Sequence, residues 1–169
     1  VVNIDSKPAA DYLKTLDRRV ATYAIENSDA EYRATNIRYS SMETNFDFVR
    51  GSVCDGDYAT HILGRGNILN ITAALAVAEH LGVSSSACHR AVKQIEQVEH
   101  RLSMRRSGGI TILDDAYNSN PEGARMALEV LSGFACEGRH YLVTPGFVEM
   151  GAKQYENNKR FGVDIARSN

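Results

Sequence analysis

Short apolar runs and longer amphipathic segments alternate along the second half of the chain. Residues 110–113 are apolar and mostly β-branched, which predicts a buried strand. Asn120 is a good N-cap and precedes a proline, so a helix is predicted over 121–131. The apolar run 141–144 and the helical pattern 153–166 repeat this order. The alternation predicts a Rossmann-like α/β domain with a parallel sheet and right-handed crossovers, truncated after its second strand.

The first half of the chain contains short alternating segments. A strand is predicted to end near residues 1–3, and Pro8 opens a short amphipathic helix. Further alternating segments follow, separated by polar or glycine-containing turns at 27–29 and 54–56. These segments are 20–25, 32–39, 46–49 and 58–63. We therefore predict an antiparallel subsheet in this half of an α/β chain.

Two helices are predicted after the subsheet. The first covers 68–81, is rich in alanine, ends at Gly82 and should be almost entirely buried. The second runs from the N-cap Ser84 to about residue 97. Its predicted inward-facing residues are Ala87, Ala91, Val92 and Ile95.

Asn67 and Asn70 are three residues apart at the start of the first of these helices. Their side chains would lie on one face, where the amides could bind the hydrogen-bonding edge of a nucleobase. The alternative is that Asn67 is only the N-cap and Asn70 a solvated neighbour. The spacing alone does not decide between these interpretations.

Residues 98–105 show no clear periodicity, so we predict a first domain at 1–100 and a second at 101–169. Asp114 and Asp115 follow the predicted strand at its carboxyl end, where open α/β sheets bind ligands. They could hold a hydroxyl-rich or cationic group, or simply solvate a turn. Arg101 could pair with a phosphate or stack on a base, or be a solvated charge or an interdomain salt bridge.

Composition narrows the classes of function. The 169 residues carry a formal net charge of −2, which is no nucleic-acid footprint. No apolar run approaches the roughly 20 residues that a membrane span needs. The 3 cysteines are widely spaced, as in reduced cytosolic proteins, and neither they nor the 5 histidines have metal-ligand spacing. The sequence does not begin with Met, so we expect it to start inside a longer chain.

Phosphate-binding and nucleophile motifs are missing from the sequence. It contains no Gly-x-x-x-x-Gly-Lys-Ser/Thr loop, no Gly-x-Gly-x-x-Gly fingerprint and no Gly-x-Ser-x-Gly elbow. The chain alone is therefore a poor candidate for a complete kinase or ligase.

The order of the motifs resembles the Mur ligases, which build the peptide of the peptidoglycan precursor. The most discriminating segment is Asp114-Asp-Ala-Tyr-Asn-Ser-Asn-Pro121. It is similar to the Asp-Asp-Ser-Tyr-Asn-Ala-Asn-Pro of the D-alanyl-D-alanine-adding branch, MurF. The other segments that resemble family motifs are 1–5, 33–37, 64–78, 100–102 and 143–151.

This resemblance implies an ATP-dependent reaction on a UDP-N-acetylmuramoyl-peptide. The family transfers the ATP γ-phosphate to a carboxylate, and an amine such as D-Ala-D-Ala then attacks the acyl phosphate. The resemblance places Asn67 and Asn70 against adenine, Arg101 near the nucleotide and Asp115 on the ribose hydroxyls, with Tyr117 and Asn118 beside the phosphates or the interdomain cleft. It places Phe147, Glu149 and Met150 near the incoming amine.

The resemblance also assigns the two domains. Residues 1–100 would be the C-terminal part of the P-loop-type central ATPase domain, and 101–169 the N-terminal part of the C-terminal domain. The phosphate loop, the catalytic residues and the Mg²⁺ ligands are expected upstream of Val1, so no catalytic or metal residue is assigned in this chain. A cytoplasmic ligase is implied, with no nucleic acid or membrane partner.

Several positions depart from the family pattern. Gly66 replaces the usual His, Ser6 the second acid of the first motif, and Ala116 and 145–146 alter the two C-terminal motifs. Two alternatives stay open. The chain could belong to another amino-acid ligase, such as a folylpolyglutamate-synthase-like enzyme, or it could be a noncatalytic nucleotide-binding or assembly module on the same scaffold.

Overall fold

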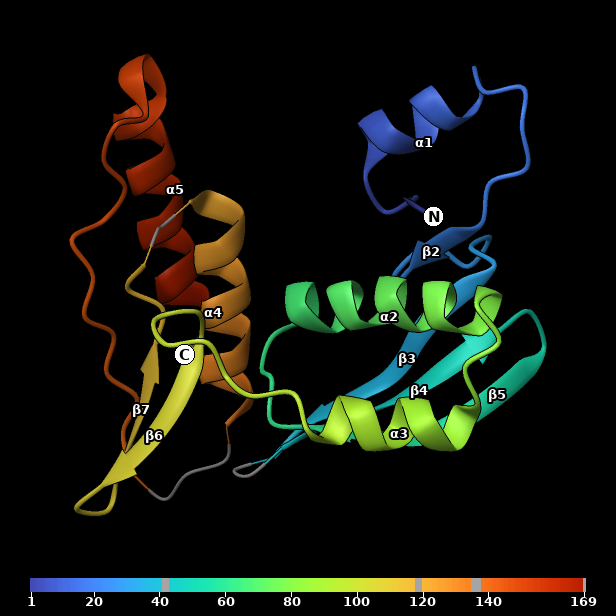
Figure 1. Ribbon diagram of the computed structural model, residues 1–169. Coiled ribbons are helices and arrows are strands. Elements are labelled where there is room, and N and C mark those ends of the chain that lie inside the picture. Colours follow the sequence, from blue (N-terminus) through green and yellow to red (C-terminus); the bar gives the residue numbers. More distant parts are fainter. Residues whose placement is uncertain (41–42, 118–119, 135–137, 169) are drawn as a thin grey trace. The chain divides into compact units, whose positions relative to one another are not determined.

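The computed structural model describes residues 1–40, 43–117, 120–134 and 138–168 (Figure 1). The chain divides into two compact units. Unit 1 comprises Val1–Arg38 and Met42–Glu96, and unit 2 comprises Tyr39–Ser41 and Gln97–Asn169. The main division thus falls between Glu96 and Gln97. The assignment of 1–100 and 101–169 to two particular domains stays a prediction.

Unit 1 is built on a five-stranded sheet with the order β1-β2-β3-β4-β5. The strands are β1 (Val2–Asn3), β2 (Thr22–Ala24), β3 (Tyr32–Tyr39), β4 (Thr44–Arg50) and β5 (Val53–Thr60). β4 and β5 are antiparallel, as predicted, whereas β2 is parallel to both β1 and β3. The antiparallel prediction for 20–25 is therefore wrong. A helix, α1 (Lys7–Leu13), connects β1 to β2, and such a crossover returns the chain to the same end of the sheet.

The turn between β4 and β5 is displaced from its predicted place. Residues 54–56 lie inside β5, and the turn is formed by Gly51 and Ser52. Gly51 has a φ of 55°, a left-handed conformation that glycine adopts without the penalty of a Cβ. The local sequence around Cys54 and Asp55 predicts a turn, but the pairing of these residues with β4 keeps them in a strand.

Two helices cover this sheet, α2 (Arg65–His80) and α3 (Ser85–Lys93) (Figure 1). α2 is buried along one face only, because Val77 remains 43% exposed, so the expectation of an almost entirely buried helix is wrong. α3 begins at the predicted cap, where the Ser84 side chain accepts a hydrogen bond from the Ala87 N–H. Cys88 and Val92 are its buried residues, whereas Ala91 and Ile95 are exposed. Residues four apart share a helix face, and here the 88/92 pair faces inward.

The core of unit 1 joins the sheet to these helices. Aromatic rings from β3, β4 and β5 pack against aliphatic side chains from α2 and α3. The buried set includes Tyr32, Phe46, Phe48, Tyr58, Ile68, Ile71, Leu75 and Val92. Burial of this set holds β3, β4 and β5 and the two helices within one folded body.

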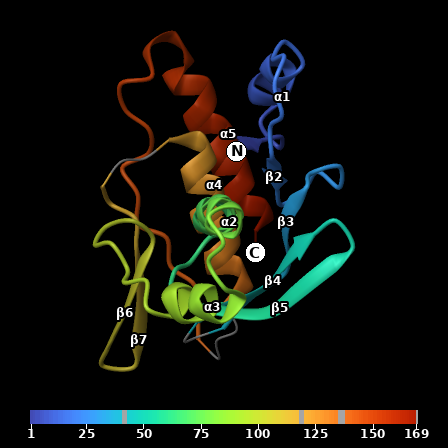
Figure 2. The same ribbon diagram turned by 45° about the vertical axis from the view of Figure 1, so that its right-hand side comes forward.

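Unit 2 contains a hairpin and two long helices. β6 (Ser103–Ser107) and β7 (Ile110–Asp114) are antiparallel, and the turn between them is Gly108-Gly109, both with positive φ. α4 (Pro121–Gly133) begins where predicted, with Asn120 as its cap. A 3₁₀ turn at Gly151–Lys153 leads into α5 (Gln154–Arg167), which packs beside α4 (Figures 1 and 2).

The predicted parallel sheet is not formed among the described residues of unit 2. Residues 141–144 form no strand, and Val143 is 95% exposed. β7 is not buried either, since Ile110 is 66% exposed. The two-glycine turn, whose positive φ angles suit a tight hairpin, directs β7 back along β6. Residues 141–144 are all exposed, so burial of their side chains does not hold them beside β7. The mixed α/β class of the whole chain is confirmed.

None of the described helices is long and apolar enough to span a membrane.

Candidate functional site

Three of the predicted site residues, Arg101, Asp115 and Tyr117, come together in unit 2. They lie on two chain segments, 100–102 and 114–117, which flank the β6–β7 hairpin. The guanidinium carbon of Arg101 lies over the Tyr117 ring, 4.0 Å from its centroid. The Asp115 Oδ1 accepts a hydrogen bond of 3.0 Å from the Leu102 N–H. The Tyr117 N–H donates to the His100 carbonyl oxygen at 3.1 Å, so the two segments are joined at both ends.

The two neighbouring carboxylates in this cluster have different environments. His100 Nδ1 lies 3.0 Å from Asp114 Oδ2, and this hydrogen bond holds the pKa of Asp114 below its usual value. Burial raises the pKa of Asp115, and the Leu102 N–H and the charge of Arg101 offset that rise only in part. Asp115 has no recorded contact through its Oδ2 among the described residues, so this oxygen can accept a hydrogen bond from a ligand hydroxyl.

The backbone around Arg101 is in an uncommon conformation. His100 and Leu102 have φ angles of 61° and 51°, in the left-handed region that residues with a Cβ rarely adopt. Leu102 is 7% exposed and its N–H is held by Asp115. Such conformations persist where surrounding contacts determine them, and they are common at ligand sites.

In unit 1, Asn67 lies in the first turn of α2. The N-cap of this helix is Gly64, so the interpretation of Asn67 as the cap is wrong. The Asn67 Nδ2 donates to the Leu63 carbonyl at 2.8 Å, and its amide oxygen has no recorded partner among the described residues. Asn70 is exposed on the same helix. Both side chains therefore have amide groups available to a ligand.

Asp5 is a residue that sequence reasoning did not single out. Its carboxylate accepts hydrogen bonds from the N–H groups of Ile25 at 2.7 Å and Asn27 at 2.8 Å, and from that of Glu26 between them. Glu26 in turn forms an ion pair with Arg65 at 3.3 Å. Asp5 thereby fixes the loop after β2 beside the first turn of α2, which contains Asn67. Asp5 belongs to the segment 1–5, which resembles a family motif, but its hydrogen-bond partner Ile25 is 20 residues away in the sequence. The sequence alone therefore does not indicate this contact.

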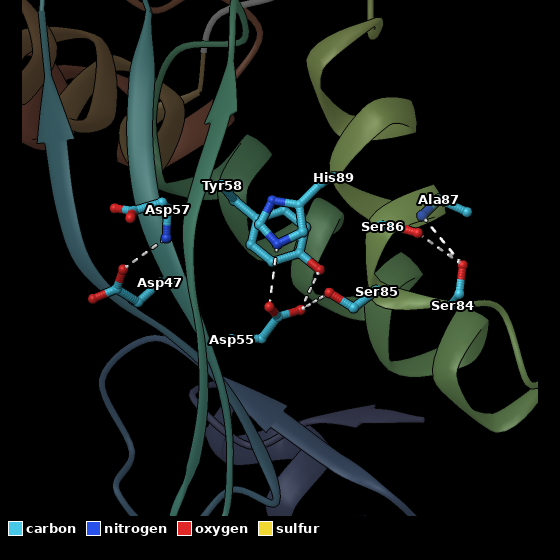
Figure 3. A network of polar contacts seen from close by, with 9 residues as sticks. All are labelled: Asp47, Asp55, Asp57, Tyr58, Ser84, Ser85, Ser86, Ala87 and His89. Carbon is cyan, nitrogen blue, oxygen red and sulfur yellow. Dashed lines mark hydrogen bonds and ion pairs between the residues drawn. The ribbon is translucent and has the colours of Figure 1, made fainter.

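A second unpredicted cluster joins β5 to α3 (Figure 3). The Asp55 Oδ2 accepts hydrogen bonds from the Tyr58 hydroxyl and the Ser85 hydroxyl, both at 2.8 Å. The Asp55 Oδ1 lies 3.2 Å from the His89 Nε2, and the His89 ring stacks on Tyr58 with 3.8 Å between centroids. The Ser85 hydroxyl donates to Asp55 and not to His89, so His89 is not placed to activate Ser85 as a nucleophile. The cluster instead links β5 to α3.

A β-bulge brings Asp55 and Tyr58 to the same side of β5. Residues three apart on a regular strand point to opposite faces, but the pairing of β4 with β5 shifts between Phe46 and Phe48. Asp57 lies in the bulge with a φ of 60°, and its N–H donates to Asp47 at 3.2 Å. Figure 3 shows this bond on one side of β5 and the Asp55 cluster on the other.

The cluster shifts the pKa values of its members. Burial pushes the pKa of Asp55 upward, but hydrogen bonds from Ser85, His89 and Tyr58 outweigh it and bring the pKa below its usual value. Burial and the bond to the Asp55 carboxylate raise the pKa of Tyr58. Both shifts favour one state, an ionised Asp55 beside a neutral Tyr58.

The loop at 145–150 contains the residues predicted to face the amine. The Phe147 side chain is 2% exposed and packs against Leu128 and Phe161, so it anchors the loop instead of presenting a surface. Glu149 is exposed with a φ of 60°, and Met150 is partly buried. Contact of these residues with a substrate stays a prediction.

Asn118, the last predicted site residue, lies outside the described residues. No group of three or more His, Cys, Asp or Glu side chains that could hold a metal ion occurs in the described part of the chain.

Comparison with known proteins identifies the scaffold. Residues 1–78 match the model of the Mur ligase middle domain. The UDP-N-acetylmuramate–L-alanine ligase of Anaeromyxobacter sp. (strain Fw109-5) is 30% identical over 129 residues, which are 76% of this chain and 28% of that protein. The chain belongs to the Mur ligase family. A second ligase with this name, from Roseiflexus sp. (strain RS-1), is 36% identical over 105 residues, 58% of this chain and 22% of that protein.

Solved structures of other Mur ligases share the fold. MurF from Acinetobacter baumannii superposes with a TM-score of 0.83 at 23% identity, over 98% of this chain and 35% of that one. MurF from Thermotoga maritima in complex with ADP has a TM-score of 0.73 at 21% identity, over 95% and 36%. At these identities the likeness shows the fold alone. The Mur ligase chain described here spans 28% of the length of the first curated relatives it matches.

Proposed function

We propose that this chain is the part of an ATP-dependent amide ligase that ends the central ATPase domain and begins the C-terminal domain. The observation that carries the proposal is the pairing of segments 100–102 and 114–117 around Arg101 and Asp115 in a Mur ligase fold. The family activates a carboxylate as an acyl phosphate, and this intermediate must be kept from water. The proposed substrate carrier is a UDP-N-acetylmuramoyl-peptide, and the proposed location is the cytoplasm.

Six residues of the chain have a proposed task toward ATP. The amides of Asn67 and Asn70 would contact adenine, because an amide offers both a donor and an acceptor to the edge of a base. The Asp115 Oδ2, which has no recorded contact among the described residues, would accept hydrogen bonds from the ribose hydroxyls. The Arg101 guanidinium would approach the phosphates, and Tyr117 and Asn118 would lie beside the phosphates or the interdomain cleft. Mg²⁺ accompanies ATP in the proposal, and we assign it no ligand among the described residues.

The favoured reaction is addition of D-alanyl-D-alanine to the UDP-linked tripeptide. Its support is the segment from Asp114 to Pro121, in which Tyr117 and Asn120 stand at the positions of the MurF pattern. Glu149 and Met150 are the residues proposed to lie nearest to the dipeptide.

A second candidate reaction is addition of L-alanine to UDP-N-acetylmuramate. It is favoured by the curated sequence relatives, which carry that ligase name at 30% and 36% identity. A folylpolyglutamate synthase of Thermotoga maritima also shares the fold, with a TM-score of 0.54 at 24% identity over 76% of this chain. The substrate, rather than the fold, separates these candidates.

A ligase assay on the full-length gene product tests the proposal. The protein is incubated with ATP and Mg²⁺ and one of two substrate pairs, UDP-N-acetylmuramoyl-tripeptide with D-Ala-D-Ala or UDP-N-acetylmuramate with L-alanine. Phosphate release and the mass of the amide product are measured, with ATP omitted as the control. Formation of the D-Ala-D-Ala adduct supports the favoured reaction, and formation of the L-alanine adduct supports the second candidate in its place. ATP binding with neither product would favour a noncatalytic module, and no ATP binding would overturn the proposal.

A further inference from the structure

The contact between Arg101 and Tyr117 is the least explained feature of unit 2. Tyr117 is 67% exposed, so its ring is not a core residue. Its hydroxyl has no recorded hydrogen bond among the described residues, and the ring contacts the Arg101 guanidinium at 4.0 Å. Arg101 forms no recorded ion pair within that part of the chain. A planar guanidinium over the face of an aromatic ring is attracted to it electrostatically, and Arg makes such contacts more often than Lys.

The backbone of residues 100–102 is held by more contacts than the Arg101 side chain. Residue 101 lies between His100 and Leu102, both with positive φ. The His100 carbonyl is bound by the Tyr117 N–H, and the Leu102 N–H by Asp115. These bonds set where the Arg101 side chain starts, but a long side chain has many rotamers. Among the contacts of the described residues, the Tyr117 ring is the one that restricts them.

The positive charge of Arg101 acts to lower the pKa of the Asp115 carboxyl, against the larger effect of burial, which raises it. The Arg101 charge therefore acts on the carboxyl group that is proposed to bind the ribose hydroxyls. Loss of the Tyr117 ring would leave both hydrogen bonds of the backbone intact and release only the guanidinium, since the Tyr117 N–H belongs to the main chain.

We propose that Tyr117 is a positioning residue, whose ring holds the Arg101 guanidinium in place to receive a phosphate group of the nucleotide. This inference rests on the proposed function and adds a role that works through Arg101. A guanidinium fixed before the ligand arrives loses less conformational freedom on binding, which strengthens binding without any new contact. The ring carries the effect and the hydroxyl does not, so phenylalanine should replace Tyr117 and leucine should not.

The test is a double-mutant cycle on ATP affinity in the full-length gene product. Tyr117→Leu should raise the Kd for ATP about two- to fivefold, the range expected for an exposed cation–π contact. Tyr117→Phe should stay within about twofold of the wild type. In an Arg101→Ala background, Tyr117→Leu should have almost no further effect, because the group it positions is gone. Tyr155→Leu is the matched control, since Tyr155 is an 80% exposed tyrosine of the same unit.

A second measurement follows the contact itself. The side-chain protons of Arg101 should show ring-current shifts in NMR spectra of the wild type and of Tyr117→Phe, and these shifts should vanish in Tyr117→Leu. Shifts that are the same in all three proteins would overturn the contact. Equal effects of Tyr117→Leu with and without Arg101 would overturn the positioning role alone. Absence of ATP binding by the wild type would instead overturn the proposed function, so the two failures are distinguishable.

Discussion

Asp114 and Asp115 are adjacent in the sequence, yet their surroundings move their pKa values in opposite directions. The hydrogen bond from His100 lowers the pKa of Asp114, so this carboxylate already has a partner within the protein. Burial raises the pKa of Asp115, whose Oδ2 is not used within the described residues. A pair of neighbouring acids thus divides into one structural residue and one available to a ligand.

Asp115→Ala should weaken ATP binding by about 1–3 kcal/mol, because charge-assisted hydrogen bonds to the ribose are lost. The measurement is isothermal titration of ATP into the full-length gene product. Asp17→Ala serves as the control, since Asp17 is exposed and has no recorded side-chain contact within the described part of the chain. An unchanged ATP affinity in Asp115→Ala would remove the ribose role from this residue.

The Asp55 cluster makes a prediction about pH. The folded-state pKa of Asp55 lies below its usual value, so its contribution to stability is present above the unfolded pKa of about 3.9 and is lost as the pH falls through the folded pKa. Asp55→Asn should cost about 1 kcal/mol at pH 7, a modest figure because the side chain is partly exposed. Urea unfolding across pH 2 to 7 should show the difference from wild type shrinking at the acidic end. A difference independent of pH would contradict this.

Helices were predicted better than strands because their ends depend on local chemistry. Asn120 accepts hydrogen bonds from the N–H groups of Glu122 and Gly123, which is the capping that its sequence position indicates. Gly82, after α2, has the positive φ of a helix terminator. Strand direction depends instead on which segments meet, and β2 and residues 141–144 were misjudged for that reason.

The loop before α5 depends on one side chain. The Asn158 Oδ1 accepts from the Phe147 N–H at 2.8 Å, and its Nδ2 donates to the Phe147 carbonyl at 2.9 Å. Gly146 has a φ of 76°, a conformation that glycine adopts without penalty, and a Cβ there would contact the same Oδ1, so glycine suits this position.

Asn158→Ala should therefore destabilise unit 2 by about 1–2 kcal/mol and speed amide exchange at Phe147, because two backbone groups lose their partner. Hydrogen exchange and urea unfolding measure both effects. Asn157→Ala is the matched control, since the recorded contact of Asn157 is a weak one to the Met150 sulfur. Equal exchange rates in the two variants would refute this role of Asn158.

At the scale of the whole molecule, each unit has its own buried cluster. In unit 1 aromatic residues of the sheet pack on α2 and α3, and in unit 2 Leu128, Phe147 and Phe161 join α4, α5 and the loop before it. The unit 2 cluster is small, and apolar residues such as Val143 remain exposed. A small core supplies little stability, so unit 2 should unfold first.

Phe46→Leu and Phe161→Leu test this expectation. Each removes packing from a different core and should cost about 1–3 kcal/mol. Unfolding is followed by NMR with resonances from both units. Phe161→Leu should move the transition of unit 2 and leave that of unit 1 in place, and Phe46→Leu should do the reverse. A single transition that both substitutions shift equally would show one cooperative body instead.

The sequence by itself determined the features that local chemistry controls. These are the presence of the helices, the caps at Ser84 and Asn120, the mixed α/β class, and the motifs that placed the chain among the Mur ligases. Tertiary structure decided the strand directions, the hairpin of β6 and β7, the burial of Phe147 and the contacts of Asp5 and Asp55. Each of these joins residues distant in the chain or depends on a bulge or a turn that changes which side chains meet. The pairing of Arg101 with Tyr117 is the clearest case, because an entire hairpin separates the two residues in sequence.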